Sequence, residues 1–158
     1  MSYIHILLLL ASCVLTKNYL CAYGDKMKKA LLFDDDEGCR KVIIAALADY
    51  DIKTEAHHDP TCFLKKADKC PVDKPCVDII ITDNQMPNMT GLDFLKRLDE
   101  MECEIPARNK AIISGDLSKK DLEKIEKLGS IAFNKPCSLT GIYDWLEEIG
   151  IILRQTNC

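Results

Sequence analysis

Apolar and polar positions along residues 27–158 follow two alternating patterns. Short apolar runs rich in Ile, Val and Leu are typical of strands that are buried on both faces. Between them, apolar residues recur every three or four positions, as they do on one face of a helix. The runs predict five strands, at residues 29–33, 53–56, 77–82, 111–113 and 131–133. The amphipathic stretches predict five helices, which begin near residues 37, 59, 90, 118 and 139.

Residues that start and stop helices lie at the ends of these stretches. Thr90 and Ser118 are each followed three residues later by an aspartate, which is the spacing of a capping box. Asp59 before Pro60 predicts an N-cap with proline at the first helical position, and Gly129 predicts a helix end. The predicted buried faces of the last three helices are Leu92, Leu95 and Leu98; Leu122, Ile125 and Leu128; and Leu139, Ile142, Trp145, Leu146 and Ile149.

Strands that alternate with helices predict an α/β fold, a parallel sheet with helices on both faces. Right-handed crossovers leave few topologies. Both common doubly wound strand orders place a ligand crevice at the carboxyl ends of the strands. The residues that directly follow each strand are therefore the candidates for function.

Composition fits one domain and excludes several functions. The chain has 158 residues, of which 47% are apolar, and a net charge of −4. These values exclude disorder for most of the chain and disfavour non-specific binding of nucleic acid. Residues 6–15 form an apolar run that is too short to span a bilayer and follows no Lys or Arg. We expect residues 1–26 to be an apolar leader, either a non-native start or a signal-like segment, and residues 27–158 to form the domain.

The nine cysteines include no C-x-x-C pair, so a zinc ribbon or a thioredoxin-type site is not expected. Reduced thiols that act as small apolar residues are the favoured interpretation, although Cys70 and Cys76 could pair if oxidised. His57 and His58 are adjacent, so on a strand they would point to opposite faces and not share a metal ion.

Four strand ends carry chemically active side chains. Asp34-Asp35-Asp36-Glu37 follows the first strand, Asp83 the third, Ser114 the fourth, and Lys135-Pro136 the fifth. Carboxylates gathered at one edge repel one another and favour a hard cation such as Mg²⁺. Together with an ammonium and a hydroxyl group, they supply the groups that phosphoryl transfer needs, with a carboxylate as nucleophile.

These residues resemble the receiver domain of two-component response regulators over about residues 28–154. The run from Asp83 to Gly91 matches the family pattern D-x-x-M-P-x-M-x-G at every defined position. LLFDDDEGCR resembles the end of the family's first strand, with Arg40 in the usual place, and Ile113-Ser114-Gly115 resembles its switch segment. Lys135-Pro136 resembles the family's lysine and proline, a bond that is usually cis. The resemblance implies a flavodoxin-like sheet of order 2-1-3-4-5.

The resemblance also implies a role for each residue. Asp83 would stand exposed and accept a phosphoryl group from a phosphohistidine, so the domain would catalyse only its own phosphorylation and dephosphorylation. Lys135 would bind a phosphoryl oxygen, and the Ser114 hydroxyl would signal that the phosphoryl group is present. Gln85 would border the site and tune the attack of water on the acyl phosphate. The implied ligands of Mg²⁺ (or Mn²⁺) are Asp34, Asp35, Asp83 and the backbone carbonyl of Gln85.

One departure concerns the switch. The family usually has an aromatic residue three positions before the lysine, where this chain has Ala132. Phe133 comes next, and a shift of one residue in a strand turns a side chain to the opposite face. We therefore expect Phe133 to be a core residue and the output signal to be transmitted in another way.

Two other functions fit parts of the sequence. A haloacid-dehalogenase-like phosphatase would use Asp34 as its nucleophile, but that interpretation leaves the Asp83 run unexplained. A pseudo-receiver that acts only as an interaction module is disfavoured because every phosphorylation residue is present.

The implied partners are a sensor histidine kinase or a histidine phosphotransfer protein, and a downstream protein target. Neither nucleic acid nor a membrane is expected, and a homodimer through the last two helices stays open. Residues 150–158 are too few for an output domain, so we expect a stand-alone receiver. The resemblance to the family implies a cytoplasmic location, because kinase partners deliver phosphoryl groups there.

Overall fold

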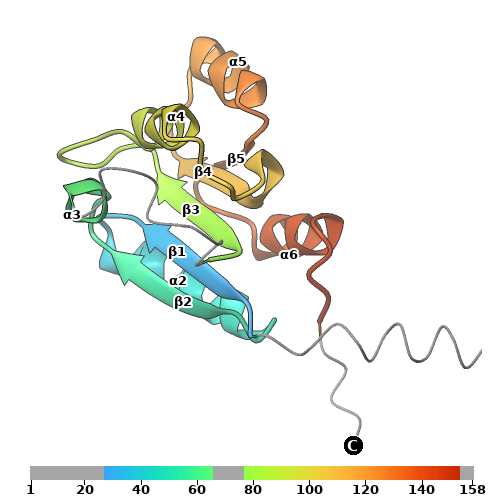
Figure 1. Cartoon of the computed structure of the whole chain (residues 1–158). Helices are drawn as coiled ribbons and strands as arrows, with labels where there is room; N and C mark the ends of the chain where they lie inside the picture. Colours follow the sequence, from blue (N-terminus) through green and yellow to red (C-terminus); the bar gives the residue numbers. More distant parts are fainter. Residues whose placement is uncertain (1–26, 66–76, 154–158) are drawn as a thin grey trace, which may run out of the picture.

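The computed structural model describes residues 27–65 and 77–153. Its centre is a five-stranded parallel sheet of order β2-β1-β3-β4-β5 (Figure 1). The predicted doubly wound topology is confirmed. The strands are β1 (Lys29–Phe33), β2 (Lys53–His57), β3 (Ile79–Asp83), β4 (Lys110–Ser114) and β5 (Ile131–Asn134).

Helices cover both faces of this sheet. The helices are α2 (Glu37–Ala48), α3 (Thr61–Lys65), α4 (Gly91–Glu100), α5 (Lys119–Lys127) and α6 (Leu139–Glu148), with a short 3-10 turn, η1, at Ala107–Asn109. On one face, which we call the α2–α6 core, Ile43, Leu47, Ile142 and Trp145 pack against the sheet. On the other face, the α4–α5 core, the packed residues include Phe94, Leu95, Leu98 and Ile125.

The three central strands are mostly apolar because both of their faces are buried. Along β1, Leu31 and Phe33 belong to the α4–α5 core, whereas Ala30 and Leu32 belong to the α2–α6 core. Successive side chains point to opposite faces, and both faces are covered, so every position from residue 30 to 33 is buried. The same holds for all of β3 and β4.

The predicted helix boundaries are largely confirmed. Thr90 and Ser118 accept the backbone N–H of Asp93 and Asp121, respectively. Asp59 accepts the N–H of Thr61 at 2.7 Å, and Gly129 ends α5 with φ = +68°. The predicted helix that begins near residue 59 is described only as far as Lys65. The rest of it, the Cys70–Cys76 pair and the leader lie outside the described residues.

Two predictions made from the pattern of apolar residues were wrong. The third strand begins and ends later than predicted, because residues 77 and 78 precede the first ladder pairs and Asp83 still belongs to the strand. Leu122 and Leu139 are exposed, although periodicity placed both on buried faces. Helix α5 contacts the edge strand β5 and α4, so it covers only the margin of the sheet and part of its apolar stripe faces water.

Within residues 27–65 and 77–153, no helix is both long enough and apolar enough to cross a membrane.

Candidate phosphorylation site

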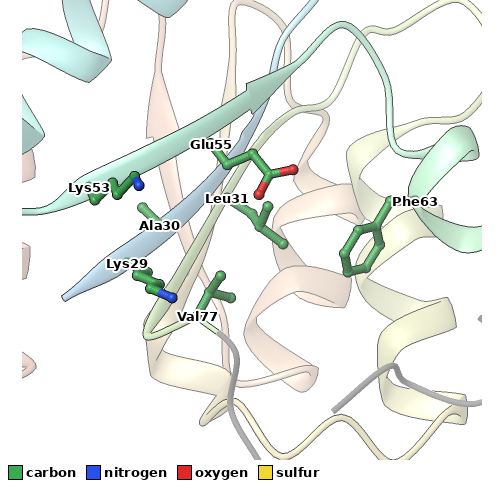
Figure 2. A pocket seen from close by; sticks show the side chains of 7 residues that line it. All are labelled: Lys29, Ala30, Leu31, Lys53, Glu55, Phe63 and Val77. Carbon is green, nitrogen blue, oxygen red and sulfur yellow. The ribbon is translucent and has the colours of Figure 1, made fainter. Parts of the chain in front are cut away.

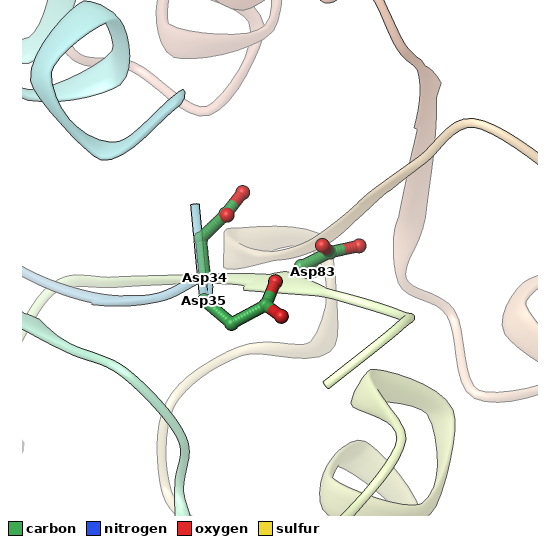
Figure 3. Close-up of side chains that lie close together, drawn as sticks. All are labelled: Asp34, Asp35 and Asp83. Atoms are coloured by element: carbon green, nitrogen blue, oxygen red, sulfur yellow. The ribbon is translucent and has the colours of Figure 1, made fainter. Parts of the chain in front are cut away.

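Three carboxylates meet where β1 and β3 end. Asp34 and Asp35 follow β1, and Asp83 is the last residue of β3 (Figure 3). These strands are parallel neighbours, with Phe33 opposite Thr82, so the next residue of each strand comes to the same edge. One carboxylate oxygen from each aspartate lies within 4.8 Å of the others. The predicted gathering of acidic groups is therefore present in the structure.

Asp34 is the innermost of the three carboxylates. Its side chain is fully buried, and its Oδ1 accepts the N–H of Asp36 at 2.8 Å. Burial raises the pKa of Asp34, the Asp36 N–H and Lys135 act in the opposite direction, and the Asp83 charge raises the pKa further. The side chain of Arg40 donates to the backbone carbonyl of Asp34 at 2.5 Å and so fixes the turn that presents it.

Asp83 is buried, and the expectation that it stands exposed is wrong. Its side chain retains 5% of its accessible surface, because Oδ2 accepts the Lys135 amine at 2.7 Å and Oδ1 accepts the N–H of Gln85 at 3.0 Å. Asp35, by contrast, is exposed. The cluster therefore opens to water on the Asp35 side, and the Lys135 amine covers one oxygen of Asp83.

Lys135 links the two buried carboxylates. It follows β5, and its Nζ is 3.0 Å from Asp34 Oδ2 as well as 2.7 Å from Asp83 Oδ2. Burial alone would lower the pKa of Lys135, but its hydrogen bonds to Asp83 and Asp34 outweigh that effect, so its pKa lies above the usual value. The amine is thus a fixed positive charge between two negative ones. The Lys135–Pro136 bond is cis.

Ser114 ends β4 beside this group and is fully buried. Its carbonyl accepts the backbone N–H of Lys135 at 2.8 Å, which joins the ends of β4 and β5. Its hydroxyl accepts the N–H of Asp116 at 3.4 Å. The hydroxyl is therefore held by a long contact next to the site.

The side chains of β5 lie as the sequence predicts. Phe133 packs against the α2–α6 core and makes an edge contact with Trp145, with ring centroids 5.7 Å apart. Ala132 packs against the α4–α5 core. Because Ser114 is two residues after Ile112, which lies in the α4–α5 core, it shares that face with Ala132 and not with Phe133. The aromatic ring is on the face opposite to the hydroxyl group.

The loop after Asp83 contains two positioning residues that sequence reasoning did not assign. Asn84 Oδ1 accepts the N–H of Leu92 at 3.1 Å, and its carbonyl accepts the N–H of Gly91. A Cβ atom on Gly91 would lie 2.3 Å from the carbonyl oxygen of Asp83. The close approach of α4 to the end of β3 therefore requires glycine. The D-x-x-M-P-x-M-x-G match could have indicated Gly91, but nothing in the sequence pattern indicated Asn84.

The donor set fits a hard divalent cation. Carboxylate oxygens are the ligands that Mg²⁺ prefers, and it binds through one or two carboxylates while it keeps several waters. Exposed Asp35 and buried Asp83 could supply such ligands, and the exposed residue Gln85 follows Asp83 by two positions. The arrangement can hold a cation beside a buried carboxylate and an ammonium group.

A doubly wound parallel sheet with three carboxylates and a lysine at the carboxyl ends of its strands defines a flavodoxin-like α/β protein with an acidic site. The sequence profile of the response regulator receiver domain matches residues 30–146. The chain belongs to this family, the receiver domain of two-component signalling systems.

Relatives with known roles carry the same domain within longer chains. Regulatory protein VirG of Agrobacterium tumefaciens is 32% identical over 133 residues, which cover 83% of this chain and 45% of VirG. The autoinducer 1 sensor kinase/phosphatase LuxN of Vibrio campbellii is 32% identical over 76 residues, which cover 46% of this chain and 9% of LuxN. The chain spans less than half the length of either relative.

Solved structures of receiver domains share the fold. The Vibrio cholerae chemotaxis protein CheY4 superimposes with a TM-score of 0.62 at 25% identity, which covers 78% of this chain and 98% of CheY4. A CheY-like receiver domain protein from Methanospirillum hungatei superimposes with a TM-score of 0.65 at 17% identity, over 78% of this chain and 93% of that one.

A separate pocket lies against β1 and β2. It has a volume of about 270 Å³ and is bordered by the first residues of β1 and β2 (Figure 2). Its lining combines apolar residues with charged ones, namely Ala30, Leu31, Phe63 and Val77 with Lys29, Lys53 and Glu55. None of the residues predicted for phosphoryl chemistry lines it.

Proposed function

We propose that this chain is a phosphorelay receiver that takes a phosphoryl group onto Asp83 from a phosphohistidine of a partner kinase or phosphotransfer protein. The supporting observation is the convergence of Asp34, Asp35 and Asp83 within 4.8 Å, with the Lys135 amine hydrogen-bonded to two of them. Isolated acidic turns are common, but an ammonium group between carboxylates from different strands fits a site that binds a phosphoryl group.

In the proposed reaction, an oxygen of the Asp83 carboxylate attacks the phosphorus atom. A P–O bond forms, the P–N bond to the histidine breaks, and the leaving nitrogen keeps the electron pair. A bound Mg²⁺ or Mn²⁺, held by Asp34, Asp35, Asp83 and the backbone carbonyl of Gln85, would neutralise charge on the phosphoryl oxygens. Asp34 would act partly through water and Asp35 directly.

Lys135 is placed to exchange partners during this step. Its Nζ touches both carboxylates, so it can release Asp83 and take a phosphoryl oxygen while it keeps the contact with Asp34. A charge-assisted contact of this kind is strong in a partly buried site. Burial of Asp83 is thus compatible with its role, because the group that covers it is the one that would bind the product.

Ser114 would swing toward the phosphoryl group and carry the signal outward. Its contact with the Asp116 N–H is long, so little is lost when the hydroxyl moves. The output surface would comprise α5, β5 and α6, which could also form a homodimer, and it would bind a downstream protein. With Ala132 on the Ser114 face, that signal would not depend on an aromatic side chain.

We assign residues 27–158 to the receiver unit, residues 1–26 to a leader, and the site of action to the cytoplasm, where kinase partners supply phosphoryl groups. Gln85, exposed beside Asp83, would tune the lifetime of the acyl phosphate.

The test is phosphorylation of the full chain with acetyl phosphate and Mg²⁺, followed by intact mass measurement. We expect one phosphoryl adduct in the wild type and in Asp116→Asn, a matched change of a nearby exposed carboxylate. The adduct should be absent in Asp83→Asn and in excess chelator.

Each other outcome has a defined meaning. An adduct that persists in Asp83→Asn and disappears in Asp34→Asn would replace this proposal with the phosphatase mechanism. No adduct in the wild type, with either Mg²⁺ or Mn²⁺, would indicate a pseudo-receiver. Retention of the adduct in excess chelator would remove the cation from the mechanism.

A further inference from the structure

The pocket against β1 and β2 has two lysines side by side in its lining. Lys29 is two residues before Leu31, which belongs to the α4–α5 core, so both side chains are on that face of the sheet. In the parallel register of β1 and β2, Lys53 pairs with Lys29 and Glu55 pairs with Leu31. The side chains of Lys29 and Lys53 therefore lie on the same face of neighbouring strands, and both are exposed.

The opposite side of the pocket is apolar. Leu31 and Val77 are buried members of the α4–α5 core, and Phe63 of α3 packs against that core and is partly buried. Phe63 also makes edge contacts with Phe33 and Phe94, with ring centroids 6.0 and 6.4 Å apart, which hold its ring in place. Figure 2 shows the two lysines on one side of the pocket and Phe63 on the other. The pocket thus combines a cationic side with an apolar one.

The two amines of the pocket lack an anionic partner within residues 27–65 and 77–153. In those ranges, neither Lys29 Nζ nor Lys53 Nζ takes part in an ion pair. The acidic residue of the lining, Glu55, is instead hydrogen-bonded through Oε1 to His57 Nε2 at 2.8 Å. Like charges directly opposite each other on a sheet repel. An anion that binds between the amines would offset this repulsion.

We propose that this pocket binds a small carboxylic acid, whose carboxylate lies between the amines of Lys29 and Lys53. The compact apolar body of the ligand packs against Leu31, Phe63 and Val77, and the aromatic ring of Phe63 favours a ring in the ligand. The volume of about 270 Å³ is below the value of about 300 Å³ at which pockets for drug-sized ligands begin, so the ligand is smaller than these. None of the residues proposed for phosphoryl transfer lines the pocket, so this binding does not rest on the proposed function.

The test is titration of the isotopically labelled full chain with benzoate, followed by the chemical shifts of its backbone amides. We expect saturable shifts that are confined to the first residues of β1 and β2 and to the neighbourhood of Phe63 and Val77. Benzamide keeps the ring without the charge, and acetate keeps the charge without the ring. Each should bind about ten-fold more weakly than benzoate. Added NaCl should weaken the binding of benzoate, because salt screens exposed amines.

Charge variants of the lining test the orientation of the ligand. Lys29→Gln and Lys53→Gln should each weaken the binding of benzoate about three-fold, and the double variant about ten-fold, which is the scale of exposed charge pairs. Glu55→Gln should strengthen binding about two-fold, because it removes a charge that repels the carboxylate. Lys120→Gln is the matched control, because Lys120 is exposed on α5 and does not line the pocket. The control should bind benzoate as the wild type does.

Each contrary result would overturn a defined part of the proposal. Shifts that do not saturate, or that lie away from the pocket, would overturn the binding site. Equal binding of benzoate and benzamide, or unchanged affinity in the double lysine variant, would overturn the role of the amines. An equal loss in Lys120→Gln would mean that net charge and not the pocket controls binding. Phosphorylation of Asp83 is measured separately, so a chain that binds benzoate and accepts no phosphoryl group would count against the proposed function alone.

Discussion

Charge balance at the site depends on a single amine. Asp34 and Asp83 are both buried, and like charges taken out of water repel strongly. Among the described residues, the positive group that hydrogen-bonds to both is Lys135. The native state accepts this arrangement because the amine compensates two carboxylates at once. Removal of the amine should therefore show how much repulsion it offsets.

We expect Lys135→Met to lower the free energy of unfolding by about 2 kcal/mol at neutral pH, since a buried carboxylate then lacks its partner. Without the amine, burial and Asp83 would raise the pKa of Asp34 further. A carboxyl group whose pKa is higher in the folded state costs stability above that pKa, and the cost disappears as pH falls toward the unfolded value of about 3.9. The deficit of the variant should thus be largest near pH 7 and smallest near pH 4.5.

Urea unfolding at both pH values, followed by fluorescence of Trp145, the only tryptophan in the chain, measures this deficit. Lys124→Met is the control, because Lys124 makes a 3.0 Å pair with Asp121 on the surface. That pair should contribute less than about 1 kcal/mol. Equal deficits for Lys135→Met at the two pH values would refute the electrostatic explanation.

Position 91 also has a strict requirement for one residue type, because only glycine fits there. The Cβ of Gly91→Ala would meet the Asp83 carbonyl oxygen at 2.3 Å and Thr82 Cγ2 at 2.9 Å. Because a backbone atom cannot move aside cheaply, we expect a loss of about 3 kcal/mol in unfolding free energy. Gly115→Ala, whose Cβ would have its nearest neighbour 3.9 Å away at Lys135, should lose far less. Similar losses in the two variants by urea unfolding would contradict this account.

The residues of the site could be predicted from sequence because parallel strands bring their carboxyl ends to one edge. That rule identified Asp34, Asp83 and Lys135 without coordinates. The burial of Asp83 could not be predicted, because it depends on where the flexible side chain of Lys135 comes to rest. The role of Asn84 was missed because a single amide in a loop has no periodic pattern.

At the scale of elements, side-chain caps decide where helices begin. The Thr90 hydroxyl accepts the N–H of Asp93 at 3.1 Å and donates to its carboxylate at 2.8 Å. Ser118 makes the same pair of contacts with Asp121 at the start of α5. Ser138 accepts the N–H of Gly141 at 3.4 Å. These are local interactions, so helix starts were easier to predict than strand ends or the exposure of Leu122, which depend on neighbouring elements.

We expect Thr90→Ala to lower the free energy of unfolding by about 1 kcal/mol at neutral pH, since α4 loses its cap. The Thr90 hydroxyl, followed by Lys96, holds the pKa of Asp93 below its usual value. A carboxyl group with a depressed pKa stabilises the fold above its unfolded pKa of about 3.9 and ceases to do so as pH falls through the folded value. The difference between wild type and variant should therefore shrink in acid.

Carbon-detected NMR titration of Asp93 checks the cause, because its pKa should rise in Thr90→Ala. Thr140→Ala, an exposed change in the first turn of α6, should alter neither that pKa nor the unfolding free energy by a comparable amount. An unchanged Asp93 pKa in Thr90→Ala would show that the hydroxyl is not responsible.

At the scale of the whole molecule, the sheet separates two apolar cores and leaves the acidic edge as the place where the elements meet. Asp34 and Asp35 come from the segment after β1, Asp83 from the end of β3 and Lys135 from the segment after β5. Carboxylates from segments far apart in sequence therefore repel one another at this one site. A dication that offsets this repulsion would stabilise the entire fold. The proposed cation site thus predicts a linkage between metal binding and global unfolding.

We expect Mg²⁺ at ten times its dissociation constant to raise the free energy of unfolding of the wild type by about 1.4 kcal/mol, because it binds only the folded chain. Asp35→Asn should lose most of this gain. Without Mg²⁺ it should be at least as stable as the wild type, since Asp35 is exposed and one of three like charges is removed. Urea unfolding in Mg²⁺, compared with NaCl of equal ionic strength, separates binding from screening, and a chelator should reverse the gain. An equal gain in Asp35→Asn, or in NaCl, would mean that the three carboxylates do not act together as a cation site.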